Sequence, residues 1–236
     1  MYEGEGVAVT RNALRSSLRV IPFIVLPFLF VSSASATTIW TNWTSATGGA
    51  PGSAAGSLGG VGVSYSGELD GATTNGTSPI WSPNSTFTGG TVTASPSTVG
   101  DDLRLNGSST AVNTITFASP VTNPVFAIWS LGAPGLPASF TFDEAPTFEA
   151  GGPNSFFGGS PISVSGDVVS GQEGNGVVQF TGTFTSISWT DTFENFYAFT
   201  VGSNGESPST GVPEPGTLAL LGLGLAGLAF RRGRKR

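Results

Sequence analysis

No stretch of residues 37–205 keeps apolar side chains at helical spacing for three turns. Short runs rich in Thr, Val, Phe and Trp occur instead, and Gly, Pro, Asn and Ser separate them. Many short runs at close spacing are typical of an antiparallel sandwich or barrel. We therefore predict an all-β fold, an antiparallel, jelly-roll-like β-sandwich, with strands at 38–44, 61–66, 86–93, 112–118, 124–130, 138–142, 161–165, 176–182, 184–190 and 195–201.

Two segments of this region have distinct compositions. Residues 124–131 (PVFAIWSL) are almost continuously apolar. This pattern predicts a central strand that is buried on both faces. Residues 45–60 (SATGGAPGSAAGSLGG) consist of small residues, and their composition predicts a flexible loop.

The ionisable residues exclude several function classes. The chain has no His and no Cys, and its single Lys is Lys235. Zinc sites built on Cys or His, Cys nucleophiles and Ser-His-Asp triads are therefore excluded. Between Thr37 and Thr210 the chain has 12 acidic residues and one basic residue, Arg104. Such a surface repels phosphate backbones, so we expect no nucleic-acid partner.

The acidic residues are the main candidates for a binding or catalytic site. Calcium takes six to eight oxygen ligands, and Gly/Asn-rich loops can supply carbonyl oxygens. A structural calcium ion is thus one interpretation, and solvated surface charge is the other; we expect no other cofactor. Glycosidases also use two carboxylates, but few basic groups are present to tune them, so we expect no enzyme. The pairs are Asp101 with Asp102, Asp143 with Glu144, Asp191 with Glu194, and Glu68 with Asp70.

Three tryptophans near predicted loops could stack on sugar rings. They are Trp40, Trp43 and Trp81. Trp129 and Trp189 lie in apolar runs, and we expect them in the core. A large aromatic side chain is more often buried than functional. Trp40, Trp43 and Trp81 therefore have two alternative interpretations: a sugar-binding platform, or a structural role in the core.

The N-terminal residues 1–36 have the three parts of a secretory signal. A basic flank precedes the 12-residue apolar stretch Val20–Val31, and Ala34 and Ala36 form a small-residue cleavage site for signal peptidase. The alternative is a membrane anchor. Twelve helical residues span only about 18 Å, which is short for a bilayer core of roughly 30 Å. The basic residues are Arg11, Arg15 and Arg19.

The C-terminal part also has three segments. A linker at 206–216 contains Pro213, Glu214 and Pro215, and an uncharged apolar stretch follows at 217–230. We predict a transmembrane helix for this stretch, although Leu218–Phe230 would span only about 20 Å. The basic tail at 231–236 should stay in the cytoplasm, with residues 37–211 on the other side of the membrane. This tail contains Arg231, Arg232, Arg234, Lys235 and Arg236.

The order of these three C-terminal segments resembles the PEP-CTERM sorting signal. That resemblance implies retention in the inner membrane, processing by an exosortase, and delivery to the cell surface or the extracellular matrix, where exopolysaccharide is a possible partner. The alternative is a plain tail anchor. Residues 114–201 resemble, more loosely, the bodies of other exported proteins with this signal, which implies no active residues. We expect a non-enzymatic surface or matrix protein; the alternatives are a lectin-like carbohydrate-binding module and, less favoured, an extracellular glycan hydrolase.

Overall fold

The computed structural model describes residues 1, 37–74, 78–96, 101–204, 220 and 222–224. The expected signal peptide beyond Met1, the linker 206–216 and the basic tail 231–236 lie outside the described residues. Of the expected membrane helix, only Leu220 and residues 222–224 are described, and they are helical. Among the described residues, no helix is both long and apolar enough to cross a membrane.

The described part of the body is mostly β-structure arranged in two eight-stranded sheets. In sheet A the order is β10-β14-β8-β16-β6-β5, with β1 beside β16 and β11 beside β14. All pairs in sheet A are antiparallel except β11 with β14, which is parallel. Its strands are β1 (Ile39–Trp40), β5 (Gly71–Thr73), β6 (Asp102–Leu105), β8 (Pro124–Leu131), β10 (Thr147–Gly151), β11 (Ser160–Pro161), β14 (Gly174–Gln179) and β16 (Tyr197–Ser203).

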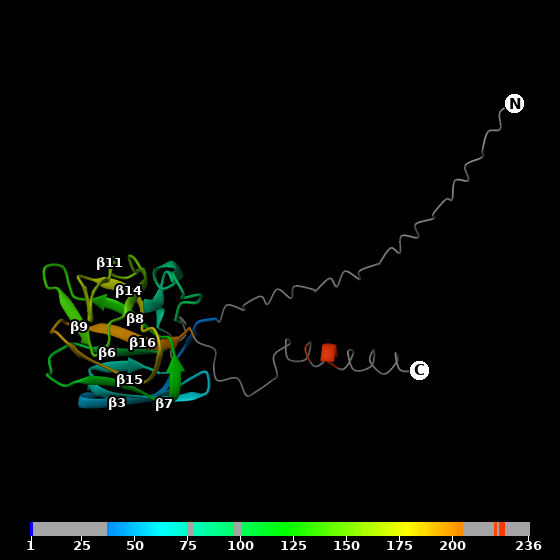
Figure 1. Cartoon of the computed structure of the whole chain (residues 1–236). Coiled ribbons are helices and arrows are strands. Elements are labelled where there is room, and N and C mark those ends of the chain that lie inside the picture. The colour runs from blue at the N-terminus through cyan, green and yellow to red at the C-terminus, as the bar shows by residue number, and fades with distance from the viewer. Residues whose placement is uncertain (2–36, 75–77, 97–100, 205–219, 221, 225–236) are drawn as a thin grey trace. The chain divides into compact units, whose positions relative to one another are not determined.

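Sheet B is antiparallel throughout, in the order β12-β13-β9-β15-β7-β4-β3-β2. Figure 1 shows the two sheets as two layers, with β8, β14 and β16 in one and β3, β7 and β15 in the other. The strands of sheet B are β2 (Asn42–Thr47), β3 (Gly49–Leu58), β4 (Val61–Leu69), β7 (Asn113–Thr122), β9 (Ala138–Phe142), β12 (Ser163–Ser165), β13 (Val168–Gly171) and β15 (Thr183–Asp191).

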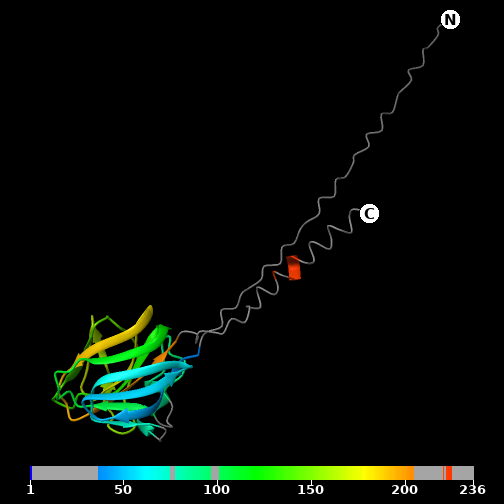
Figure 2. The ribbon, with the colours of Figure 1, turned by 90° about the horizontal axis from the view of Figure 1, so that it is seen from below.

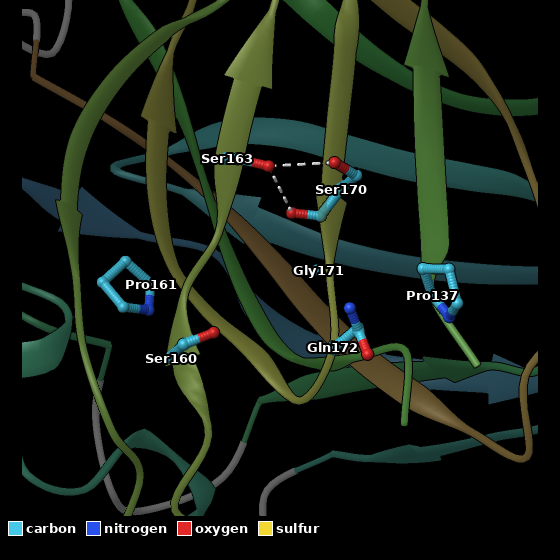
Figure 3. Close-up of a pocket in the computed structure, with 7 residues that line it drawn as sticks. All are labelled: Pro137, Ser160, Pro161, Ser163, Ser170, Gly171 and Gln172. Carbon is cyan, nitrogen blue, oxygen red and sulfur yellow. Dashed lines mark hydrogen bonds between the residues drawn. The ribbon is translucent and has the colours of Figure 1, made fainter. Parts of the chain in front are cut away.

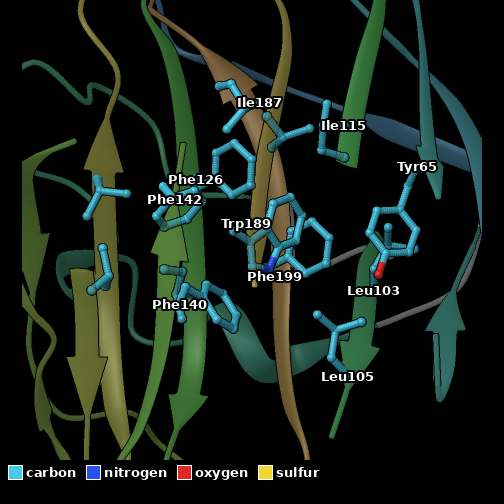
Figure 4. Close-up of a cluster of buried hydrophobic side chains, with 14 of the residues drawn as sticks. Tyr65, Leu103, Leu105, Ile115, Phe126, Phe140, Phe142, Ile187, Trp189 and Phe199 are labelled. Carbon is cyan, nitrogen blue, oxygen red and sulfur yellow. The ribbon is translucent and has the colours of Figure 1, made fainter. Parts of the chain in front are cut away.

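The main core lies between the two sheets and is rich in aromatic rings (Figure 4). Trp189 of sheet B packs edge-on against Phe126 and Phe199 of sheet A, with ring centroids 5.5 and 5.1 Å apart. Period-two alternation places every second residue of β15 and β16 on the inner face. The aromatic contacts therefore join the two layers directly.

Strand β8 is buried on both faces along its whole length, as its apolar run predicts. Phe126 and Ile128 belong to the core between the sheets, whereas Val125, Ala127 and Trp129 belong to a second cluster on the outer face of sheet A. Two 3-10 helices, η1 (Pro79–Trp81) and η2 (Asn84–Thr86), contribute Trp81 and Thr86 to the buried residues that cover this face. The irregular segment that contains η1 and η2 thus covers the outer face of sheet A, where a three-layered fold has a further layer of helices or strands.

The prediction of a flexible loop at 45–60 is wrong. These residues form half of β2 and all of β3; β2 pairs with β3, and β3 also pairs with β4 (the blue and cyan strands of Figure 2). Small residues are required here because the chain packs closely: a Cβ at Gly52 would lie 2.6 Å from the Leu69 Cβ. Composition alone does not distinguish such a strand from a linker, because in both the side chains are small.

The prediction of a strand at 86–93 is also wrong. This segment contains η2 and an isolated bridge between Gly89 and Val92. Its apolar residues Phe87 and Val92 are buried in the outer cluster without a sheet neighbour. Conversely, the prediction missed four short strands, β5, β6, β10 and β13, because three to five residues carry too little alternation to be recognised.

Candidate functional site

An open groove lies where β11, β12 and β13 meet and has a volume of about 220 Å³. Figure 3 shows Pro161 and Pro137 on its two sides, with Gln172 between them. Ser163 donates from its Oγ to the Ser170 carbonyl at 3.3 Å, and their hydroxyl oxygens are 3.0 Å apart. The lining residues are Pro137, Ser160, Pro161, Ser163, Ser170, Gly171 and Gln172.

The groove lining has no ionisable side chain. Its hydroxyls and its amide can donate and accept hydrogen bonds, and its two proline rings offer flat apolar surfaces. General acid–base catalysis needs a titratable group within reach of the substrate. The groove is therefore suited to binding an uncharged polar molecule rather than to proton transfer.

The predicted sugar platform is not formed. Trp43 and Trp81 have no exposed surface, so neither can stack on a sugar from solution. Trp43 belongs to the core between the sheets, where its Nε1 donates to the Thr200 Oγ1 at 3.2 Å. Trp81 packs edge-on against Phe87 in the outer cluster. Both residues take the structural role that large aromatics usually have.

Trp40 is half-buried and also structural. Its Nε1 donates to the Ala94 carbonyl at 2.9 Å, and its ring covers Gly202 on the neighbouring strand β16. A Cβ at position 202 would lie 2.7 Å from this ring. Trp129 and Trp189 are buried, as predicted.

Glu68 and Asp191 lie close enough in the fold to interact electrostatically, although the sequence suggested other partners for each. Glu68 is buried at the end of β4 and accepts from the backbone N–H groups of Ser108 and Ser109 at 3.2 and 2.9 Å. Asp191, at the end of β15, accepts from the Tyr197 hydroxyl at 2.8 Å. The Tyr65 hydroxyl donates to Asn113 Oδ1 at 2.6 Å in the same region.

The pKa of the Asp191 carboxyl is raised from 3.8 to about 6: burial is the largest cause, the hydrogen bond from Tyr197 opposes it, and the Glu68 charge adds to the rise. Burial also raises the pKa of the Glu194 carboxyl, against hydrogen bonds from two backbone N–H groups. The pKa values of the Tyr65 and Tyr197 hydroxyls are raised by burial and then by the Asp191 charge. Both tyrosines therefore stay neutral donors at any physiological pH.

Other predicted acids serve the sheets as hydrogen-bond acceptors. Asp101 accepts from the Trp43 N–H at 3.0 Å, and Asp143 accepts from the Ser188 N–H at 3.0 Å. Asp102 forms an ion pair of 3.2 Å with Arg104. Over the described ranges, no three of the acidic side chains form a group that could hold a metal ion. Calcium binding stays a prediction.

Sequence reasoning missed the aromatic side chains that are exposed. Phe156, Phe157 and Phe193 are each more than half exposed. The sequence contains a weak signal for the first two, because they stand in a turn-like stretch, GGPNSFFGGS, where no strand alternation buries them. Exposed aromatic side chains that gather in one place mark interaction sites.

The two ends of the described body lie side by side. The Thr38 Oγ1 donates to the Asn204 Oδ1 at 2.6 Å, and Thr38 and Thr93 are joined by backbone-to-side-chain hydrogen bonds of 2.9 and 2.8 Å. The Asn204 amide also donates to Gln179 Oε1 at 2.7 Å. The segments that precede residue 37 and follow residue 204 are therefore attached at one place on the body.

Comparison with known proteins identifies one of these segments. The sequence model described as the PEP-CTERM protein-sorting motif matches residues 211–235, which include Pro213, Glu214 and Pro215. No curated protein and no solved structure matches the chain. A motif of this kind implies export and an exosortase as the processing partner. The chain thus carries a PEP-CTERM protein-sorting motif at its C-terminus.

Proposed function

We propose that this chain is a non-enzymatic protein that is exported, held in the inner membrane by residues 217–230, processed by an exosortase, and placed on the cell surface or in the extracellular matrix. In this proposal, signal peptidase cuts after Ala36, Pro213, Glu214 and Pro215 are recognised by the exosortase, and residues 231–236 set the orientation. The match at residues 211–235 carries the proposal.

The geometry of the body supports processing at both ends. Thr38 and Asn204 are hydrogen-bonded neighbours, so both processing sites are attached to one point of the fold. Residues 205–216 are 12 residues long and reach at most about 40 Å when extended. An enzyme in the membrane can thus act on the linker without unfolding the sheets.

Two further observations support the non-enzymatic reading and the sandwich fold. The carboxylates Glu68, Asp101 and Asp143 accept hydrogen bonds from backbone N–H groups that they help to order. The chain also changes sheet repeatedly, since β8, β9 and β10 lie in sheets A, B and A in turn. Such crossing between sheets is expected of the jelly-roll-like arrangement.

The sorting proposal predicts the effect of deleting residues 211–236. The full chain and the deletion variant are expressed in a host with a functional exosortase, and the cells are fractionated. We expect the full chain to yield a shortened, surface-associated form, and the deletion variant to lose almost all membrane retention and to leave the cell without further C-terminal shortening. Intact-mass measurement checks both ends of each product.

Two substitution variants refine this test. Replacing Pro213 and Pro215 with Ala leaves the apolar stretch intact and should block processing, so that the chain accumulates in the membrane. Replacing Ser207 and Ser209 with Ala, in the same linker, is the matched control and should be processed normally. Equal processing of all four forms would overturn the sorting proposal.

A second candidate function is binding of neutral carbohydrate by the body. The observation that favours it is the uncharged groove of hydroxyls, an amide and two proline rings (Figure 3). Sugars present many hydroxyls and apolar C–H surfaces, and pockets that bind such molecules combine apolar walls with a few placed polar groups. An acidic polysaccharide would be repelled by a body with 12 acidic residues and one basic residue.

This second function predicts the effect of replacing Gln172 with Ala. Loss of one hydrogen bond of about 1 kcal/mol should weaken neutral-glycan binding roughly fivefold in isothermal titration. Ser57→Ala is the control, because Ser57 lies on β3 at the opposite side of sheet B from β12 and β13. Unchanged binding in Gln172→Ala would exclude the groove as the site.

A further inference from the structure

The turn at residues 154–158, which we call the aromatic turn, displays two adjacent phenylalanines. The side chains of Phe156 and Phe157 are 52 % and 54 % exposed. The turn lies between β10 and β11 and is closed by a bridge between Asn154 and Gly158. Two phenyl rings are therefore held at the surface by a short, closed loop.

Hydrogen bonds through Asn154 hold this turn in place. The Asn154 side chain is nearly fully buried, and its Nδ2 donates to the carbonyls of Ile80 and Ser82 at 2.5 and 2.7 Å. Its Oδ1 accepts from the Phe156 N–H at 2.8 Å, and the Ser155 N–H donates to the Ser82 carbonyl at 2.9 Å. A surface loop with this many internal bonds is ordered before any ligand arrives, and preorganisation lowers the entropic cost of binding.

The turn continues into an aromatic row on the outer face of sheet A. The Phe157 ring lies 5.4 Å from the Trp129 ring, and Trp129 lies 5.6 Å from Phe196. Trp129 is buried beneath them, and its Nε1 has no hydrogen-bond acceptor among the described residues. The exposed Phe157 ring thus rests on a rigid aromatic base.

The charges around the turn restrict the chemistry of its partner. Residues 152–160 and 80–85 contain no ionisable side chain. The acids beside the turn are Glu173, whose carbonyl accepts from the Ser160 N–H and whose carboxylate accepts from the Ser130 hydroxyl, and Glu194, which is buried. The rest of the body has a large excess of acids, which repels anionic lipid surfaces and acidic polymers. An anionic partner is therefore disfavoured here, and an uncharged partner matches the uncharged side chains of the turn itself.

We propose that the aromatic turn is a stacking surface for a neutral polysaccharide, with Phe156 and Phe157 contacting the C–H faces of successive sugar rings. The electron-rich faces of phenyl rings attract the slightly positive C–H groups of a pyranose. The neighbouring Ser82 and Ser155 hydroxyls, 3.2 Å apart, offer hydrogen bonds at the edge of the stack. This proposal rests on the second function above and assigns its aromatic contacts to residues that the sequence did not suggest.

The test measures binding by the full chain, purified in a non-ionic detergent. Affinity electrophoresis through gels containing a soluble β-glucan, a mannan or a galactan gives an apparent Kd for each, and polygalacturonate serves as the acidic polysaccharide. We expect at least one neutral polysaccharide to retard the chain. The double variant Phe156→Ala/Phe157→Ala should bind it at least about tenfold more weakly, which corresponds to about 1.4 kcal/mol.

Two controls separate a lost contact from a lost fold. Phe157→Tyr keeps an aromatic ring and should bind as the original chain does. Phe148→Ala removes a phenyl ring that is 43 % exposed, but Phe148 pairs with Val178 of the core and so points to the other face of sheet A. It should also bind normally, and circular dichroism should show folded chains throughout.

The outcomes distinguish the proposals from one another. Weaker binding in Gln172→Ala but not in the double phenylalanine variant would overturn the aromatic turn and leave the groove as the site. Absence of retardation by every neutral polysaccharide would overturn both, while the sorting proposal, tested by fractionation, would be unaffected. Retardation by polygalacturonate or binding to phosphatidylglycerol vesicles that the double phenylalanine variant loses would overturn the proposal that the ligand of the turn is neutral.

Discussion

Phe126→Ala should lower the free energy of unfolding by about 3–5 kcal/mol, the range for a fully buried phenylalanine. Phe126 has no exposed surface and lies within 6 Å, ring centroid to ring centroid, of Phe142, Phe180, Trp189 and Phe199. Two of these rings belong to sheet B and one to strand β16 of sheet A. Truncation would therefore leave a cavity where the two layers meet.

Phe156→Ala is the matched control because it removes the same atoms from the surface. Its ring is 52 % exposed, and we expect a change within about 1 kcal/mol. Urea unfolding followed by tryptophan fluorescence measures both variants. A loss for Phe126→Ala as small as that for Phe156→Ala would contradict a core centred on this ring and with it the packing of the two sheets.

Asp191→Asn should stabilise the chain at neutral pH and reduce the pH dependence of its stability. The Asp191 pKa of about 6 in the fold is above the value near 3.9 expected in the unfolded chain. The folded state thus binds this proton more tightly, and stability falls as pH rises from about 4 to about 6, by up to about 1.4 kcal/mol per pH unit. Above pH 6 Asp191 is charged in the folded state and its destabilising effect reaches its maximum. The uncharged amide of Asn at this position has no such effect.

Thermal unfolding from pH 4 to pH 8 measures this effect. The Tm of Asp191→Asn should exceed that of the original chain at pH 8, and the difference should shrink toward pH 4. A residual slope from Glu194, whose pKa is also raised by burial, should remain in the variant. Identical slopes for Asp191→Asn and the original chain would contradict the raised pKa of Asp191.

Several features of the site required the tertiary structure because they depend on residues far apart in the chain. Glu68 and Asp191 interact across 123 positions of sequence, whereas the sequence had paired Glu68 with Asp70 and Asp191 with Glu194. The groove combines Pro137 with Ser160 and Ser170 from different strands. From the sequence, Trp43 and Trp81 were candidates for a place near the surface, but both are buried. The exposed aromatic side chains include Phe156 and Phe157, which the sequence did not suggest.

Three features could be predicted from the sequence alone: the β-class of the body, the burial of β8 on both faces and the C-terminal sorting motif. Each of these is a local property: the period of apolar residues, one continuous apolar run, and the order of three adjacent segments. The three-dimensional fold was needed to show that residues 45–60 form strands, which carboxylates meet, and which aromatic rings face solvent. Those outcomes depend on strand pairing and on which face each strand buries, and both are set by contacts between distant parts of the chain.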